Sequence, residues 1–103
     1  MYIIVFYVPE KSCDLVKQAM FDAGAGQLGD YDSCAWQVLG QGQFRPLSGS
    51  KPAIGQIEQL EYVDEYRVEM MCRENAIEAS ILALKKSHPY EEVAYHVVKM
   101  VDI

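Results

Sequence analysis

The sequence has few cysteines and no long apolar run. Cys13, Cys34 and Cys72 are odd in number and widely spaced, so the sequence supports neither a disulfide framework nor a zinc knuckle built on C-x-x-C pairs. A reducing cytoplasm is therefore the expected compartment. No apolar stretch approaches the ~20 residues that span a bilayer. The apolar run at residues 2–8 lacks the basic start and the cleavage site of a signal peptide.

Basic residues are also scarce. Nine lysines and arginines face fifteen aspartates and glutamates, which gives a formal net charge of -6. The basic residues are scattered apart from Lys85-Lys86, so no basic stripe follows any segment. An acidic surface repels the phosphate backbone and anionic lipid. We therefore expect neither a nucleic acid nor a membrane partner.

The remaining composition is that of one ordinary globular domain, residues 1–103. Half of the residues are hydrophobic, and a chain of this length buries enough surface to form a core without disulfides or metal ions. Residues 2–8 are apolar at every position, which predicts a strand at the centre of a sheet. Ser12 is a suitable N-cap for a helix whose end is marked by Gly24.

The second half of the chain repeats the strand and helix signals. Residues 56–72 alternate apolar and charged side chains from Leu60 onward, which predicts a half-buried strand with a bulge near Val63-Asp64. Asn75 and Glu78 resemble a capping box that opens a second helix. Pro89 ends that helix, and residues 93–101 form a last strand. The order β-α-β-β-α-β predicts an α+β, ferredoxin-like sandwich with both helices on one face.

The second and third strands are too long for a compact sheet and predict an extended two-stranded arm. Gly40 and Gly42 lie inside the first strand of this arm and indicate a bulge, a bend or a close backbone approach. Exposed strand edges invite pairing with another chain. We therefore expect self-association through the arm, with Trp36, Phe44 and Leu60 at the interface.

One dense polar cluster, His88-Pro89-Tyr90-Glu91-Glu92, follows the second helix. His88, Glu92 and His96 are candidate metal ligands, although His88 lies on the inner stripe of the helix and is more simply a structural group. Arg45 and Lys51 are the cations near the tip of the arm, and they could attract an anion.

Two blocks of sequence together resemble one family. Gly40-Gln41-Gly42-Gln43-Phe44-Arg45-Pro46, continued by Gly49-Ser50-Lys51-Pro52-Ala53-Ile54-Gly55, is similar to the G-x-G-x-F-R-P…P-A-I-G signature of the Nif-three-like (YqfO) family. Residues 88–92 resemble its H-P-Y-E-E signature. The matched part is the inserted domain, which is similar to CutA and PII-like proteins. His96 departs from the aspartate that this family more often shows there, and the segments that carry the family's two-metal centre are absent.

The resemblance implies a stand-alone CutA/PII-like domain that acts as a non-catalytic binding or regulatory module, without a cofactor, as a homo-oligomer with a trimer favoured. Two alternatives remain open: a protein that binds a divalent metal or uses it in catalysis, and a PII-like sensor of a small anionic metabolite. The candidate ligand-binding residues are Arg45, Lys51, His88, Tyr90, Glu91 and Glu92.

Overall fold

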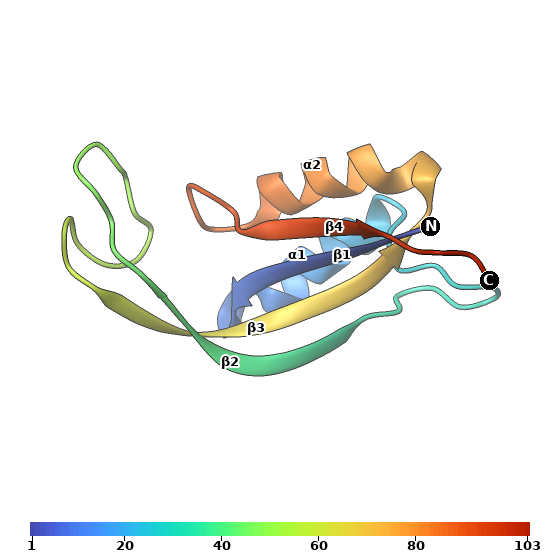
Figure 1. The fold of residues 1–103 in the computed structure, drawn as a ribbon, viewed down its shortest axis with the longest axis horizontal. Coiled ribbons are helices and arrows are strands. Elements are labelled where there is room, and N and C mark those ends of the chain that lie inside the picture. The colour runs from blue at the N-terminus through green and yellow to red at the C-terminus, as the bar shows by residue number, and fades with distance from the viewer.

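The computed structural model describes the whole chain, Met1 to Ile103. Its elements follow the predicted order: β1 (Tyr2–Pro9), α1 (Glu10–Asp22), β2 (Trp36–Phe44), β3 (Glu61–Cys72), a short 3-10 turn η1 (Glu74–Ala76), α2 (Ile77–Ser87) and β4 (Tyr95–Lys99). The strands form one antiparallel sheet in the order β2-β3-β1-β4 (Figure 1). β1 therefore lies inside the sheet, as its uninterrupted apolar sequence predicts.

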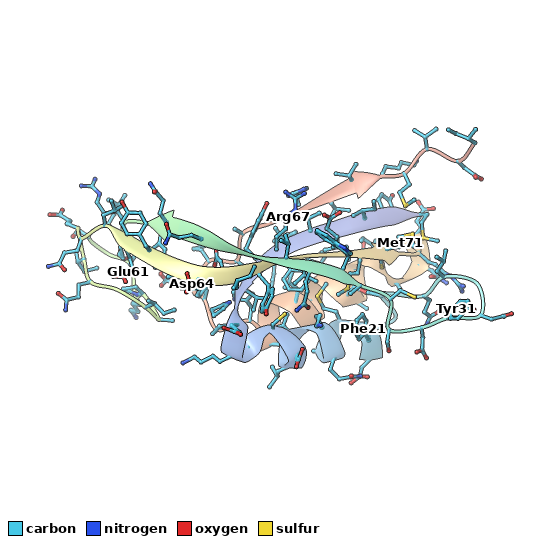
Figure 2. All side chains as sticks on the ribbon, turned by 90° about the horizontal axis from the view of Figure 1, so that it is seen from below. Phe21, Tyr31, Glu61, Asp64, Arg67 and Met71 are labelled. Carbon is cyan, nitrogen blue, oxygen red and sulfur yellow. The ribbon has the colours of Figure 1, made fainter.

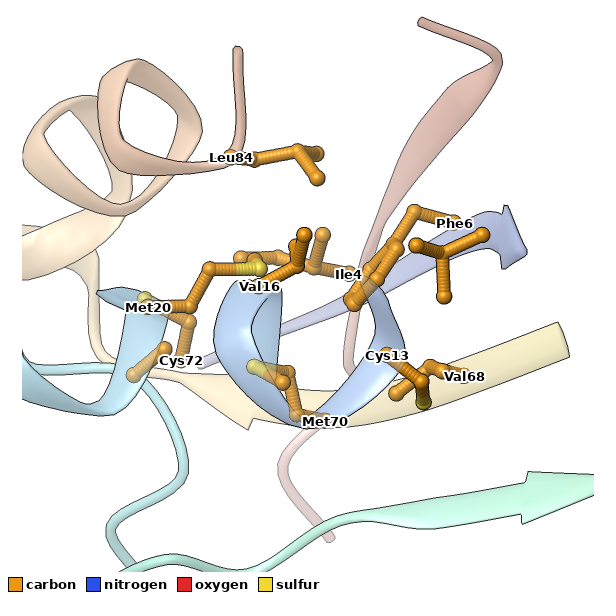
Figure 3. Close-up of a cluster of buried hydrophobic side chains, with 11 residues drawn as sticks. Ile4, Phe6, Cys13, Val16, Met20, Val68, Met70, Cys72 and Leu84 are labelled. Atoms are coloured by element: carbon orange, nitrogen blue, oxygen red, sulfur yellow. The ribbon is translucent and has the colours of Figure 1, made fainter. Parts of the chain in front are cut away.

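The core lies between one face of the sheet and the two helices. Alternate residues of β1 and β3 point to this face, because side chains of a strand alternate between its two sides. They meet apolar side chains from α1 and α2 (Figure 3). The fully buried members of this cluster include Ile4, Phe6, Val8, Val16, Met20 and Leu84. The predicted placement of both helices on one face is confirmed.

The helix starts differ from the predictions. α1 begins at Glu10, directly after β1, and Pro9 occupies the N-cap position with no side-chain cap. Ser12 is therefore inside the helix, and its prediction as N-cap is wrong, because the helix begins immediately after the strand, with Pro9 as the last extended residue. The predicted end of the helix is confirmed, since Gly24 follows the C-cap with φ 110°.

The second helix also begins without a side-chain cap. The turn η1 precedes α2, and neither Asn75 nor Glu78 makes the capping hydrogen bonds that the sequence suggests. The capping-box prediction is wrong because the chain tightens into a 3-10 turn at this point, so that backbone bonds take the place of side-chain caps. Lys85 and Lys86 lie in the last turn of α2, where cations are favourable.

The arm is an overhang of β2 and β3. β1 pairs with β3 only as far as Glu65, whereas β2 continues along β3 to the pair Phe44–Glu61. The predicted overhang is confirmed, and the long axis of the molecule measures 46 Å. The predicted bulge at Val63-Asp64 is wrong, because the pairing runs through both residues without a skipped position. Beyond β1 no helix covers the ladder, so a strict apolar alternation is not required there.

The face of the sheet opposite the helices is uncovered. Trp36 and Val38 of β2 lie on this open face, 61% and 44% exposed, and Val98 of β4 is 51% exposed. Arg67 and Glu69 share the face and form an ion pair of 3.5 Å; Figure 2 labels Arg67 on the side away from the helices. Neither helix is long and apolar enough to cross a membrane.

Candidate functional site

A cavity of about 800 Å³ lies where the arm joins the body of the domain; we refer to it as the arm cavity. Three parts of the chain line it: the end of β2 with the following loop (residues 38–54), the loop after α2 (residues 90–94), and Tyr7, Glu65 and Arg67 of β1 and β3. In Figure 1 the loop between α2 and β4 turns at the same end of the sheet as the arm. The two sequence blocks, at residues 40–55 and 88–92, are separated in the chain by residues 56–87 and therefore meet only in the folded structure.

His88 supports one wall of the arm cavity without facing it. Its side chain is buried, and its Nε2 lies 2.7 Å from the carbonyl oxygen of Tyr7. The backbone N–H of Tyr90 donates to Nδ1 of His88 at 3.1 Å. Nδ1 is therefore an acceptor and Nε2 the donor, which describes a neutral imidazole with both nitrogens satisfied. Burial lowers the pKa of His88, and the hydrogen bond to the Tyr7 carbonyl opposes this shift only in part.

Tyr90 ties the loop after α2 to the arm. Its hydroxyl donates to Oε2 of Glu65 at 3.1 Å, and its ring lies against His88 and Phe44, with ring centroids 4.7 and 6.4 Å away. Burial raises the pKa of Tyr90, and the negative charge and the hydrogen bond of Glu65 raise it further. The phenol therefore stays protonated and remains a donor at neutral pH.

Gly42 leaves room for the carboxylate of Glu65 beside the backbone of β2. A Cβ atom built on Gly42 would overlap Oε1 of Glu65, so any other residue here would displace that carboxylate. The sequence suggested a bulge, a bend or a close approach at the strand glycines. The structure shows a close approach at Gly42 and an unbroken ladder.

The candidate ligand-binding residues are distributed unevenly around the cavity. Arg45, Tyr90, Glu91 and Glu92 line it. Lys51 contributes its backbone N–H, which donates to Oε1 of Glu91 at 3.0 Å and joins the tip loop to the opposite wall. The side chain of His88 stands behind Tyr90, as described above.

The metal candidates His88, Glu92 and His96 do not assemble into a site. His96 is exposed on β4, opposite Val5 of β1, and both ring nitrogens of His88 are already hydrogen-bonded. The chain contains no group of three or more His, Cys, Asp or Glu side chains that could hold a metal ion. These residues do not fit a metal site.

The interface candidates occupy three different settings. Trp36 is exposed at the start of β2, and Leu60 is 50% exposed just before β3, at the opposite end of the same ladder. Phe44 is half-buried against Tyr90 and lines the arm cavity.

Sequence reasoning missed Tyr7, Glu65 and Arg67 as cavity residues. Tyr7 belongs to a strand that is apolar throughout, and the two charged residues look like the solvated face of an alternating strand. The available signal was cross-strand pairing: Gly40 lies directly opposite Glu65 in the ladder, and a glycine facing a carboxylate leaves room beside it.

The chain resembles part of several curated proteins. It is 42% identical over 97 residues to the GTP cyclohydrolase 1 type 2 homolog of Mycobacterium tuberculosis, which is 94% of this chain and 26% of that protein. It is 45% identical over 94 residues to the Bacillus subtilis protein of the same name, 91% of this chain and 25% of that protein. The chain thus spans about a quarter of the length of these relatives. No protein-family model matches it.

Solved structures agree with this partial match. A Bacillus cereus protein related to NIF3 superposes with a TM-score of 0.84 and 36% identity, over 98% of this chain and 26% of that one. CutA of Pyrococcus horikoshii superposes with a TM-score of 0.72 over the whole of this chain and 87% of that one, at 18% identity. Over nearly its whole length the chain is therefore homologous to one quarter of the GTP cyclohydrolase 1 type 2 (NIF3) homologs, and that quarter has the CutA fold.

Proposed function

We propose that this domain is a non-catalytic ligand-binding module and that the arm cavity is its binding site. The observation that carries the proposal is the meeting of the two sequence blocks around one cavity. The volume falls within the roughly 300–1,000 Å³ of small-molecule sites. Apolar side chains from the arm and the tip loop share the lining with a few polar groups, which is the usual make-up of such a site.

The proposed role is regulatory because a ligand in this cavity would touch the arm and the body at once. Two hydrogen bonds already join these parts, Tyr90 to Glu65 and Lys51 to Glu91. A ligand that binds between them favours the arrangement in which both walls are in place. Occupancy would thereby fix the arm tip, which a partner could recognise.

Two features support a non-catalytic module in preference to an enzyme. Both nitrogens of His88 are bonded, and the phenol of Tyr90 is held protonated, so neither is poised as a base. The GTP in the relatives' name would bring four negative charges toward a wall that carries Glu65, Glu91 and Glu92. We therefore propose that any GTP chemistry takes place outside this domain.

We also propose a cytoplasmic location for the domain, because its three cysteines are free.

A library of small metabolites tests the proposal by thermal unfolding. A ligand present at a hundred times its Kd is expected to add about 2.7 kcal/mol to the free energy of unfolding. The variant Ala53→Trp places a bulky ring in the lining and should abolish the shift, whereas Ala79→Trp, on the exposed surface of α2, should keep it. A stabilising ligand that acts equally on both variants, or a library without any ligand, would contradict the proposal.

We also propose that the chain forms a homo-oligomer, with a trimer as the favoured state. The uncovered face, with Trp36 and Val98 exposed, and the free edges of β2 and β4 offer surfaces for a neighbouring subunit. A closed ring satisfies one such edge on every subunit, and CutA shares the fold.

Light scattering at micromolar concentration is expected to give about three times the 11.7 kDa of one chain. Trp36→Glu should reduce the mass, because it places a charge on the uncovered face, whereas Leu82→Glu on the exposed side of α2 should leave it unchanged. A mass of one chain that stays constant on tenfold concentration would show that the proposal is wrong.

A further inference from the structure

The charges around the arm cavity are unbalanced toward the negative. Glu65, Glu91 and Glu92 line it, against Arg45 and Arg67. Arg67 is already paired with Glu69, 3.5 Å away, which leaves Arg45 as the cation without an ion-pair partner in the structure. The whole chain, cavity included, carries a formal net charge of -6, and a field of one sign raises the local concentration of ligands of the opposite sign.

One of these carboxylates is fixed in place. Oε2 of Glu65 accepts the hydroxyl of Tyr90 at 3.1 Å, and Oε1 lies against the backbone of Gly42. Because Gly42 has no side chain, the carboxylate sits close to the strand in place of extending into solvent. Oε1 has no hydrogen-bond donor within the chain, so it can accept a hydrogen bond from a ligand.

Aromatic rings lie beside this carboxylate. Phe44 and Tyr90 have ring centroids 6.4 Å apart and planes tilted by 49°, and Tyr7 also lines the cavity. The face of an aromatic ring attracts a cation, and clustered aromatic rings are a common way to hold an ammonium group. Beyond the rings the lining is apolar, with Val38, Leu47 and Ile54 among its residues.

Resting on the proposed ligand-binding role, we infer that the arm cavity selects a small organic ammonium ion with an apolar body. The ammonium group lies beside the packed rings of Phe44 and Tyr90 and donates to Oε1 of Glu65. The hydrocarbon part of the ligand packs against the apolar lining of the arm and the tip loop. An anionic ligand would have to compete with three carboxylates for contact with Arg45.

Three probes with the same phenylethyl body and different charge test this inference: phenethylamine, 2-phenylethanol and 3-phenylpropionate. Amide NMR shifts of the wild-type chain are followed as each probe is added to about 10 mM, a range that captures weak fragments. We expect phenethylamine to shift the amides of Gly42, Phe44 and Tyr90, with a Kd about tenfold or more below that of either other probe.

Variants separate the role of Glu65 from the general charge of the chain. Glu65→Gln keeps the shape and removes the charge, and we expect it to weaken phenethylamine binding by about tenfold while 2-phenylethanol is little affected. Gly42→Ala, which displaces the same carboxylate, should weaken it similarly. Glu78→Gln removes an equal charge on α2 and should leave binding unchanged. Unperturbed amide spectra outside the cavity verify that each variant is folded.

Equal or tighter binding of 3-phenylpropionate, unchanged binding by Glu65→Gln, or no cavity shift with phenethylamine would each overturn the inference. The proposed ligand-binding role has a separate test. It is contradicted only when the metabolite library yields no ligand whose stabilising shift is abolished by Ala53→Trp.

Discussion

Replacing Phe6 by alanine is expected to lower the free energy of unfolding by about 3–5 kcal/mol, the typical cost of removing a buried aromatic side chain. Phe6 is fully buried in the central strand β1 and belongs to the cluster formed with both helices. Its removal leaves a cavity that strands on both sides of β1 keep from collapsing. Urea unfolding followed by circular dichroism measures the change.

Leu82→Ala is the matched control for this measurement. Leu82 lies on α2 and is 59% exposed, so its loss should change the free energy of unfolding by less than about 0.5 kcal/mol. A Phe6→Ala variant as stable as Leu82→Ala would mean that the cluster between sheet and helices does not hold the fold together.

His88→Ala is expected to lower the free energy of unfolding by about 1–3 kcal/mol, because it leaves buried polar partners unpaired. The ring bridges the carbonyl of Tyr7 and the N–H of Tyr90, so its loss affects β1 and the cavity wall together. His96→Ala, on the exposed side of β4, is the control and should have little effect. Chemical unfolding near pH 7.5 gives the comparison.

The pH dependence identifies the cause of that loss. The pKa of His88 is lowered in the folded chain, so the unfolded chain binds more protons as the pH falls below about 6.5. The stabilising contribution is complete above that pH and decreases as the pH falls through it. The wild type should therefore lose stability between about pH 7.5 and pH 5.5, and His88→Ala should lack that part of the slope. Identical slopes would contradict a neutral buried imidazole.

The fold was predictable because its signals are local. An uninterrupted apolar strand, an alternating strand and two amphipathic segments are each read from consecutive residues, and their order allows few topologies. The predicted starts of both helices were wrong, because the prediction relied on side-chain caps that the helices do not have. Ser12 and Asn75 have the chemistry of N-cap residues, yet α1 begins directly after Pro9, the turn η1 precedes α2, and neither helix has a side-chain cap.

The site was predictable only in its pieces. The block at Gly40–Pro46 and the cluster at His88 were both evident, but nothing in either shows that they meet. Their convergence depends on the register of β2 on β3 and on the bond from His88 to Tyr7. Glu65 was missed for the same reason, because its importance comes from Gly42 on the neighbouring strand and from Tyr90 far along the chain.

The unbroken β2–β3 ladder also governs where the chain can change in length. Inserting one residue within either strand would turn the helix-facing row toward the open face, since strand side chains alternate with a period of two. The loop at residues 45–60, which joins the two strands, carries no such parity. Insertions and deletions can accumulate there without disturbing the core. Because residues 45–54 include one wall of the arm cavity, the shape of the cavity can diversify while the ladder and the core stay the same.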